Sequence, residues 1–270
     1  MNIEHRTSNF ELRTGAKTGA VIVAGGAGKR MEGIDKLFIS FDGKPLLALT
    51  LEAFQGYPGI DVIVLVAGGA VRKRFEEEIR DRYELSKLAA VVEGGEERQD
   101  SVYNGLLAFP EPPDLVLIHD GDRPFIAPSV ITAVLAGAGE GGAIAAVPVR
   151  DTLKWVDREE CIVKTLDREV IWQAQTPQGF PFRLILAAHE KARKEGWEVT
   201  DDASMMEQMG HRVRVVKGGY DNIKITTPED IVVAEAIFGE WGVGRREEEG
   251  REGKSREEKG RTGMGPLPVT

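Results

Sequence analysis

The sequence has little of what several classes of protein require. Its 270 residues include one cysteine, Cys161, which excludes an internal disulfide and a cysteine-based zinc cluster; we interpret this side chain as small apolar filler. No apolar run reaches the roughly 18 residues of a membrane-spanning helix. Basic residues are fewer than acidic ones, 35 against 44, which argues against a nucleic-acid-binding protein that relies on phosphate neutralisation. A local basic pocket for a small phosphorylated ligand stays open.

The two ends of the chain have too few apolar residues to form a core. Residues 1–17 are polar, aperiodic and unlike a secretory signal, so we expect a flexible N-terminal extension and a cytoplasmic location. Residues 241–270 are rich in glycine and in charges of both signs. Such a composition cannot offset the entropy of ordering, and it predicts a disordered tail. The predicted globular domain therefore covers residues 18–240.

Within this domain, short apolar runs alternate with helical patterns. The predicted strands are 19–24, 61–66, 88–92, 114–119 and 143–147, and the predicted helices are 45–54, 71–83, 98–109 and 129–138. Continuous apolar strands separated by helices are typical of an α/β fold with a mostly parallel, Rossmann-like sheet covered by helices on both faces. Ligands of such sheets bind at the carboxyl ends of the strands.

The alternation stops at residues 150–167, which read as two short strands around a polar turn. We expect a protruding β-hairpin arm that either covers an active site or reaches a partner subunit. The pattern then continues with predicted strands at 171–175, 213–216 and 222–225, and with predicted helices at 182–195, 202–209 and from Pro228.

The first predicted strand ends in a glycine-rich loop, Ala24-Gly-Gly-Ala-Gly-Lys-Arg30. Such a loop lets backbone amides approach an anion. A P-loop is excluded, because Val23 and Arg30 stand where it requires glycine and serine or threonine. A dinucleotide fingerprint is excluded as well, because Met31 stands at its last glycine position. Both a nucleotide loop and a plain strand-to-helix turn remain open from these residues alone.

Three further sites follow in the sequence. Lys36 could clamp a polyphosphate together with Arg30, or could simply extend along the surface. The turn 93–101 offers free amides and the Ser101 hydroxyl for reading a base edge, or serves as a helix cap. Asp120, at the end of a strand and before glycine, suits Mg²⁺ when phosphates share the metal; the alternative is a capping aspartate.

These loops together resemble a known family, the 2-C-methyl-D-erythritol 4-phosphate cytidylyltransferases of the non-mevalonate isoprenoid pathway. The resemblance covers residues 18–238 and is carried, in order, by VIVAGGAGKRM, DKLF, GKPLL, GGEERQDSV, IHDGDRPF, PVRDTLK, TLDR, WQAQTPQGF, TDDASMME and DNIKITTPEDI. It implies a nucleotidyltransferase fold, a homodimer through the arm, Mg²⁺ as cofactor, and transfer from CTP to methylerythritol phosphate by in-line attack on the α-phosphate.

The resemblance also implies roles for individual residues. Arg30, Lys36 and Lys224 would stabilise charge in the transition state, and Asp120 would bind the metal. Arg123, Arg168 and Thr176 would bind the sugar phosphate, the last two arriving from the partner subunit. The remaining positions would bind the nucleotide: Ala24, Gly25, Gly26, Gly28, Gly94, Gly95, Glu96, Ser101 and Gly121.

Two residues depart from the family pattern. Asp122 stands where family members usually carry an uncharged residue, which places a second carboxylate near the predicted metal site; the alternative is that Asp122 pairs with Arg123. Asp35 replaces a frequent proline. Two alternatives to the main function are a ribitol 5-phosphate cytidylyltransferase, against which PVRDTLK and TLDR argue, and an idle nucleotide-binding homologue, against which the three cations argue.

Overall fold

The computed structural model describes residues 15–25 and 36–241. The chain divides into two compact units, Met1–Thr226 and Thr227–Thr270, and each is described by itself. The predicted N-terminal extension and charged tail, and the glycines and cations of the loop after the first strand beyond Gly25, lie outside the described residues.

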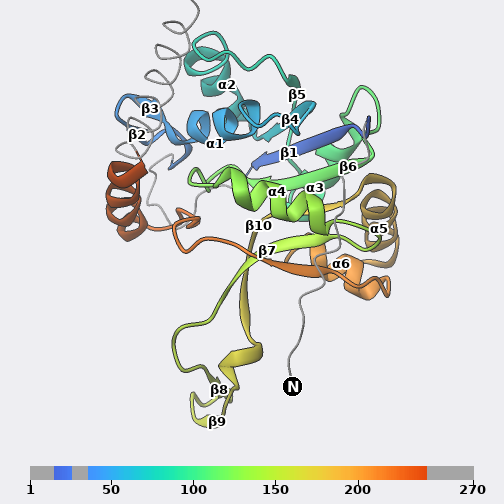
Figure 1. The fold of residues 1–270 in the computed structure, drawn as a ribbon, viewed down its shortest axis with the longest axis vertical. Helices are drawn as coiled ribbons and strands as arrows, with labels where there is room; N and C mark the ends of the chain where they lie inside the picture. The colour runs from blue at the N-terminus through green and yellow to red at the C-terminus, as the bar shows by residue number, and fades with distance from the viewer. Residues whose placement is uncertain (1–14, 26–35, 242–270) are drawn as a thin grey trace, which may run out of the picture. The chain divides into compact units, whose positions relative to one another are not determined.

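A seven-stranded sheet forms the centre of the first unit (Figure 1). β1 (Thr18–Ala24) pairs in parallel with β4 (Val62–Ala67) and with β6 (Leu115–Asp120). β5 (Leu88–Val92) follows β4 at one edge, and β11 (Arg214–Lys217) lies parallel to β7 (Ala143–Pro148) at the other. β10 (Trp172–Pro181) runs antiparallel between β6 and β7. The prediction of a mostly parallel sheet is confirmed.

Helices cover both faces of this sheet. Their bounds are α1 (Leu46–Gln55), α2 (Gly69–Glu78), α3 (Arg98–Leu107), α4 (Pro128–Gly137), α5 (Phe182–Glu195) and α6 (Asp202–Gln208). The core under α3, α5 and α6 contains alternate strand residues such as Val21, Val66 and Phe180, while α1 and α4 contact the strands from the other side. Gly105 of α3 allows close approach, because a Cβ there would lie 2.6 Å from Val21.

The predicted arm is confirmed. β8 (Lys154–Val156) and β9 (Ile162–Thr165) form an antiparallel hairpin at the tip of an arm that projects away from the sheet (Figure 1), and every residue of both strands is exposed. The side chain of Asp157 closes the turn by accepting hydrogen bonds from the amides of Glu159 and Cys161, each 2.9 Å long. Our interpretation of Cys161 as buried filler is wrong, because this turn lies in solvent.

The segment 222–225 is a loop and not the predicted strand. Its apolar pattern reflects the burial of Ile225, whose amide donates to the backbone carbonyl of Asp122. The carbonyl of Asn222 accepts from the Arg123 side chain, 2.8 Å away. The backbone groups of this segment therefore form hydrogen bonds with a side chain and with a loop distant in sequence. In a strand they would pair with the backbone of a neighbouring strand.

Three smaller differences separate the predicted elements from the observed ones. β10 extends to Pro181, where the sequence predicted a strand ending at 175. α2 ends at Glu78 and not at 83, and a short hairpin of β2 (Ser40–Phe41) and β3 (Lys44–Pro45), which was not predicted, precedes α1. In the second unit, residues 228–241 form the helix expected from Pro228. None of the helices in the described part of the chain is long and apolar enough to cross a membrane.

Candidate active site at the carboxyl end of β6

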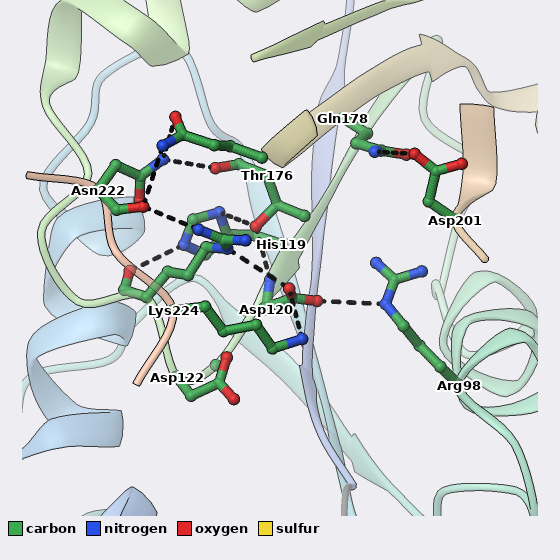
Figure 2. Close-up of polar contacts among 12 residues, drawn as sticks. Arg98, His119, Asp120, Asp122, Thr176, Gln178, Asp201, Asn222 and Lys224 are labelled. Atoms are coloured by element: carbon green, nitrogen blue, oxygen red, sulfur yellow. Dashed lines mark hydrogen bonds and ion pairs between the residues drawn. The ribbon is translucent and has the colours of Figure 1, made fainter. Parts of the chain in front are cut away.

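The last residue of β6, Asp120, is the centre of a buried charged cluster (Figure 2). Lys224 Nζ lies 2.9 Å and Arg123 Nε 3.5 Å from its Oδ2, and Arg98 Nε lies 3.2 Å from its Oδ1. Burial alone would raise the pKa of Asp120, but the charges of Arg98, Lys224 and Arg123 outweigh it and hold this pKa well below its usual range. Asp120 is therefore a permanent anion surrounded by three cations.

The backbone of Asp120 is fixed by a second set of contacts that begins at His119. Nε2 of His119 lies 3.0 Å from the carbonyl oxygen of Arg123, and because a carbonyl only accepts, Nε2 carries the proton. The bare Nδ1 then accepts from the Thr176 hydroxyl at 3.0 Å, and the Thr176 oxygen accepts from the Asp120 amide at 3.1 Å. Burial lowers the pKa of His119 to about 4, so the ring is neutral.

Arg98 continues the cluster toward α6. Its Nη1 donates to Asp202 Oδ2 at 2.7 Å, and His189 Nε2 lies 3.2 Å from the other oxygen of this carboxylate. Gln178 of β10 holds the start of α6 by bonds to the Asp201 carboxylate, 2.8 Å, and to the Ala203 amide, 3.1 Å. Asp202 thereby fixes the guanidinium group that faces Asp120.

Arg98, His119 and Asp202 were not among the sequence-predicted site residues. The first two lie inside motifs that were singled out, GGEERQDSV and IHDGDRPF, and Asp202 lies in TDDASMME. The available signal was a charged or titratable side chain at a predicted strand or helix end. Pairing Arg98 with Asp120 and Asp202 requires the fold, because both partners are distant in sequence.

Asp122 and Lys36 form a second buried pair beside Asp120. Lys36 Nζ lies 2.6 Å from Asp122 Oδ2, and the two side chains are 15% and 9% exposed. The alternative in which Asp122 pairs with Arg123 is therefore wrong, because Arg123 points to Asp120 and to the Asn222 carbonyl. Burial and the nearby charge of Asp120 raise the pKa of Asp122, against the opposing effect of Lys224 and Lys36.

Two glycine-rich turns meet next to these charges. A Cβ on Gly25, after β1, would lie 3.7 Å from the Gly94 Cα and 3.4 Å from the Ser101 Oγ. Ser101 is buried, and its hydroxyl accepts from the Gly95 amide at 3.0 Å. The turns before α3 and after β1 are thus held side by side with little side-chain bulk between them, as an approaching phosphate or base would require.

The fold brings most of the described predicted residues together. Ala24 and Gly121 are neighbours, since a Cβ on Gly121 would lie 3.3 Å from the Ala24 Cβ; Glu96 is exposed on the turn before α3. Arg168 lies on the arm, where its Nη1 donates to the carbonyl of Arg150 at 2.8 Å. Three predicted residues, Gly26, Gly28 and Arg30, lie outside the described residues.

The donor set suits a hard divalent cation that is shared with phosphates. No group of three or more metal-ligating side chains is present among the described residues. However, the Oδ1 atom of Asp122 is buried and has no hydrogen-bond partner in the described part of the chain. Mg²⁺ typically binds one or two carboxylates together with substrate phosphates, and Asp120 and Asp122 fit that requirement.

Comparisons with known proteins show which proteins the chain is similar to. The family model described as 2-C-methyl-D-erythritol 4-phosphate cytidylyltransferase (IspD) matches residues 18–240. The enzyme of that name from Geobacillus thermodenitrificans is 46% identical over 221 residues, which are 81% of this chain and 96% of the relative. The one from Pelotomaculum thermopropionicum is 44% identical over 225 residues, 82% and 94% of the two chains.

Solved structures give the same result. The crystal structure of 4-diphosphocytidyl-2C-methyl-D-erythritol synthase from Anaerococcus prevotii superposes with a TM-score of 0.74 at 33% identity, covering 83% of this chain and 96% of that one. The 2-C-methyl-D-erythritol 4-phosphate cytidylyltransferase from Thermus thermophilus has a TM-score of 0.66 at 31% identity, covering 82% and 98%.

Proposed function

Because the chain belongs to the 2-C-methyl-D-erythritol 4-phosphate cytidylyltransferase family, we propose that it is a nucleotidyltransferase that joins CTP to 2-C-methyl-D-erythritol 4-phosphate. The products are 4-diphosphocytidyl-2-C-methyl-D-erythritol and pyrophosphate. The observation that carries the proposal is the gathering of cations from three separate segments at the carboxyl end of β6. The proposal retains the cytoplasmic location expected from the sequence, where CTP is available.

The reaction needs charge neutralisation more than proton transfer. An oxygen of the sugar phosphate attacks the α-phosphorus of CTP, and the bond from that phosphorus to the bridging oxygen of the β-phosphate breaks, so that pyrophosphate leaves. The attacking phosphate is already ionised at neutral pH. His119 is neutral and both of its ring nitrogens are hydrogen-bonded inside the protein, so it orients Asp120 and does not act as a base.

The cations supply the charge neutralisation. We assign Lys36 and Arg30 to the CTP phosphates and Lys224 and Arg123 to the sugar phosphate. Lys36 and Lys224 are held by Asp122 and Asp120, and these ion pairs fix both ammonium groups at the site. A divalent cation, when bound, would neutralise further phosphate charge, with Asp120 as its predicted ligand.

The nucleotide is assigned to the glycine turns. Ala24, Gly25, Gly94 and Gly95 offer close approach, and Gly121 lies next to Ala24. The hydroxyl groups of Ser101 and Thr176 already make hydrogen bonds within the protein. We therefore expect Ser101 to act mainly by shaping its turn, in addition to its predicted ligand contact. Thr176 is buried beside Asp120 of its own chain, so the expectation that it arrives from the partner subunit is wrong, and we assign it to fixing the Asp120 backbone.

We further propose that the arm mediates a homodimer and carries Arg168 into the site of the partner. Large apolar side chains are exposed on and beside the arm, namely Trp155, Val156, Ile162, Val163, Val170 and Trp172. Exposed apolar groups gathered on one projecting element are typical of a protein interface.

The test of the activity is product formation from CTP and Mg²⁺ with either methylerythritol phosphate or ribitol 5-phosphate, followed by phosphorus NMR. The expected result is a diphosphodiester signal with methylerythritol phosphate and none with ribitol phosphate. A reversed preference would assign the protein to ribitol phosphate, and CTP binding without either product would make it a nucleotide-binding homologue.

A further inference from the structure

The carboxylate of Asp122 is only half satisfied. It is 6% exposed; Oδ2 accepts from Lys36 at 2.6 Å, while Oδ1 is fully buried with no hydrogen-bond partner among the described residues. A buried anionic oxygen without a partner is costly, and such an atom in a folded protein requires an explanation. An absent ligand is one explanation, and the surroundings of Asp122 favour it.

The neighbouring carboxylate differs in this respect. Both oxygens of Asp120 already face cations, Oδ1 facing Arg98 and Oδ2 facing Lys224 and Arg123. Figure 2 shows the Asp122 carboxyl group near Lys224. The charge of Asp120 is close enough to raise the pKa of Asp122. The free anionic acceptor of this cluster therefore belongs to Asp122.

The Lys36 contact gives the direction from which a ligand would come. Lys36 is the residue that we assign to the CTP phosphates, and it is bound to the other oxygen of the same carboxylate. Phosphates that engage Lys36 therefore lie close to Asp122, and two like charges there need a cation between them. Hard divalent cations combine carboxylate oxygens with phosphate oxygens in this way.

We propose that Asp122 is a second carboxylate ligand of the divalent cation and binds it through Oδ1, beside Asp120. The inference rests on the proposed function for the identity of the phosphates. With two carboxylates, Asp120 and Asp122, the metal site would carry two negative charges. The consequence is tighter binding of the cation, including before CTP binds.

Binding of Mn²⁺ measures this directly, without turnover. Mn²⁺ is titrated into the whole protein, first alone and then at saturating CTP without sugar phosphate, and bound metal is followed by electron paramagnetic resonance and by water-proton relaxation. Loss of a group that merely supports a metal ligand typically weakens affinity about 10- to 100-fold. We therefore expect Asp122→Asn to raise the Mn²⁺ dissociation constant by at least about 10-fold.

Two other variants separate metal binding from the anchoring of Lys36. Lys36→Met breaks the same ion pair but leaves the carboxylate, and it should bind Mn²⁺ at least as tightly as the wild type because a neighbouring positive charge is gone. Asp42→Asn removes an exposed carboxylate at a position with φ of 50°, which asparagine tolerates; it matches the change in net charge and should leave the Mn²⁺ affinity unchanged.

The outcomes are distinct. Equal Mn²⁺ affinity in wild type and Asp122→Asn, or equal losses in Asp122→Asn and Lys36→Met, would overturn the proposal and leave Asp122 as an anchor for Lys36. Should Asp122→Asn fold poorly by circular dichroism, the double variant Lys36→Met, Asp122→Asn, which buries no unpaired charge, must show the same weakened binding. Absence of product from CTP and methylerythritol phosphate in the wild type would refute the proposed function without touching this result.

Discussion

The carboxyl end of β6 and the arm differ in how their side chains are satisfied. In the cluster at the end of β6, Asp120 and Asp202 of α6 are buried, and each faces two or more charged or polar side chains from other segments. On the arm, Trp155 is 55% and Ile162 is 64% exposed, although both are large and apolar. One region is organised almost completely by its own chain, whereas the other has apolar groups that its own chain does not cover.

This difference assigns separate tasks to the two regions. Buried and mutually fixed charges provide the preorganisation on which phosphoryl transfer depends. An exposed apolar hairpin contributes little to the stability of its own chain, and it fits a role in contacts with a second copy. The comparison can be tested by changes that affect one region and spare the other.

The largest expected effect is on turnover from a change at the end of β6. Lys36→Ala should lower kcat by a factor on the order of 100–1,000 at saturating CTP, because it removes a charge proposed to meet the growing negative charge on the α-phosphate. Arg30→Ala should have a similar effect. Pyrophosphate release under steady-state conditions measures both.

The burial of the Lys36–Asp122 pair calls for a control on folding. Removing one partner of a buried pair leaves an uncompensated charge and destabilises the protein. The double variant Lys36→Met, Asp122→Asn removes both charges, so its free energy of unfolding should lie closer to that of the wild type while its activity stays low. Near-normal kcat in a folded Lys36 variant would contradict the assignment.

The elements could be predicted from the sequence more completely than the contacts. Strand 88–92 and helix 182–195 agree with the structure residue for residue, because a short continuous apolar run and a helical period of apolar residues are strong local patterns. The Lys36–Asp122 pair, by contrast, joins residues 86 positions apart, and local pattern carries no information on such a distance. The loop 222–225 looked like a strand because Ile225 is buried, although its backbone bonds to side chains.

Site residues could be predicted where the residue type and its place at the end of a strand were enough to indicate a role. They were missed where the role depends on a partner distant in sequence. Asp120 follows from an acid at a strand end. Arg98 was overlooked because its role depends on Asp202, 104 residues away. Of the two interpretations of Asp122, the pairing with Arg123 failed because adjacent residues in a turn point in different directions, which spacing alone does not reveal.

The next largest effect concerns Arg168, the residue of the arm that we assign to the sugar phosphate. A bidentate guanidinium on the sugar phosphate cannot be replaced by a short uncharged side chain, and a hydrogen bond to a charged group is worth about 1.5–3 kcal/mol. Arg168→Ala should therefore raise the KM for methylerythritol phosphate by about 10- to 100-fold. CTP binding, measured by calorimetry, should remain close to that of the wild type.

Mixed dimers then test whether the two regions belong to one site. Co-expression of Arg168→Ala with Lys36→Ala should restore activity approaching half that of the wild type per mixed dimer, because one of the two sites receives both intact residues. Dimers shown to be mixed but inactive would place Arg168 in the site of its own chain. The arm would then lose the role proposed for it.

A smaller effect is the acid sensitivity of the buried end of β6. The pKa of His119 is lowered to about 4 in the folded protein from about 6.5 in the unfolded chain. As the pH falls, the unfolded chain therefore takes up a proton at this histidine before the folded protein does. The free energy of unfolding that His119 contributes above pH 6.5 is lost as the pH falls toward 4. Between pH 7 and pH 5 the loss is about 2 kcal/mol. Urea unfolding at both pH values measures this loss.

His119→Gln provides the comparison for that measurement. Glutamine does not titrate, so the difference between pH 7 and pH 5 should shrink by nearly the whole amount attributed to His119, whatever the variant's stability at pH 7. Other groups titrate in both proteins alike. An unchanged pH dependence in the variant would show that this ring does not account for the loss.

The smallest effect is on association through the arm. Burying an isoleucine side chain contributes about 1.5–3 kcal/mol when it is complete, and Ile162 is 64% exposed, so Ile162→Ser should raise the dimer dissociation constant by about 10-fold. Sedimentation equilibrium over a range of concentrations measures this constant.

Leu107→Ser is the matched control, because Leu107 is 57% exposed but lies on α3, far from the arm in sequence. It should leave association unchanged. A wild type that stays monomeric, or equal weakening by both substitutions, would mean that the exposed apolar groups of the arm serve something other than a second copy of this chain.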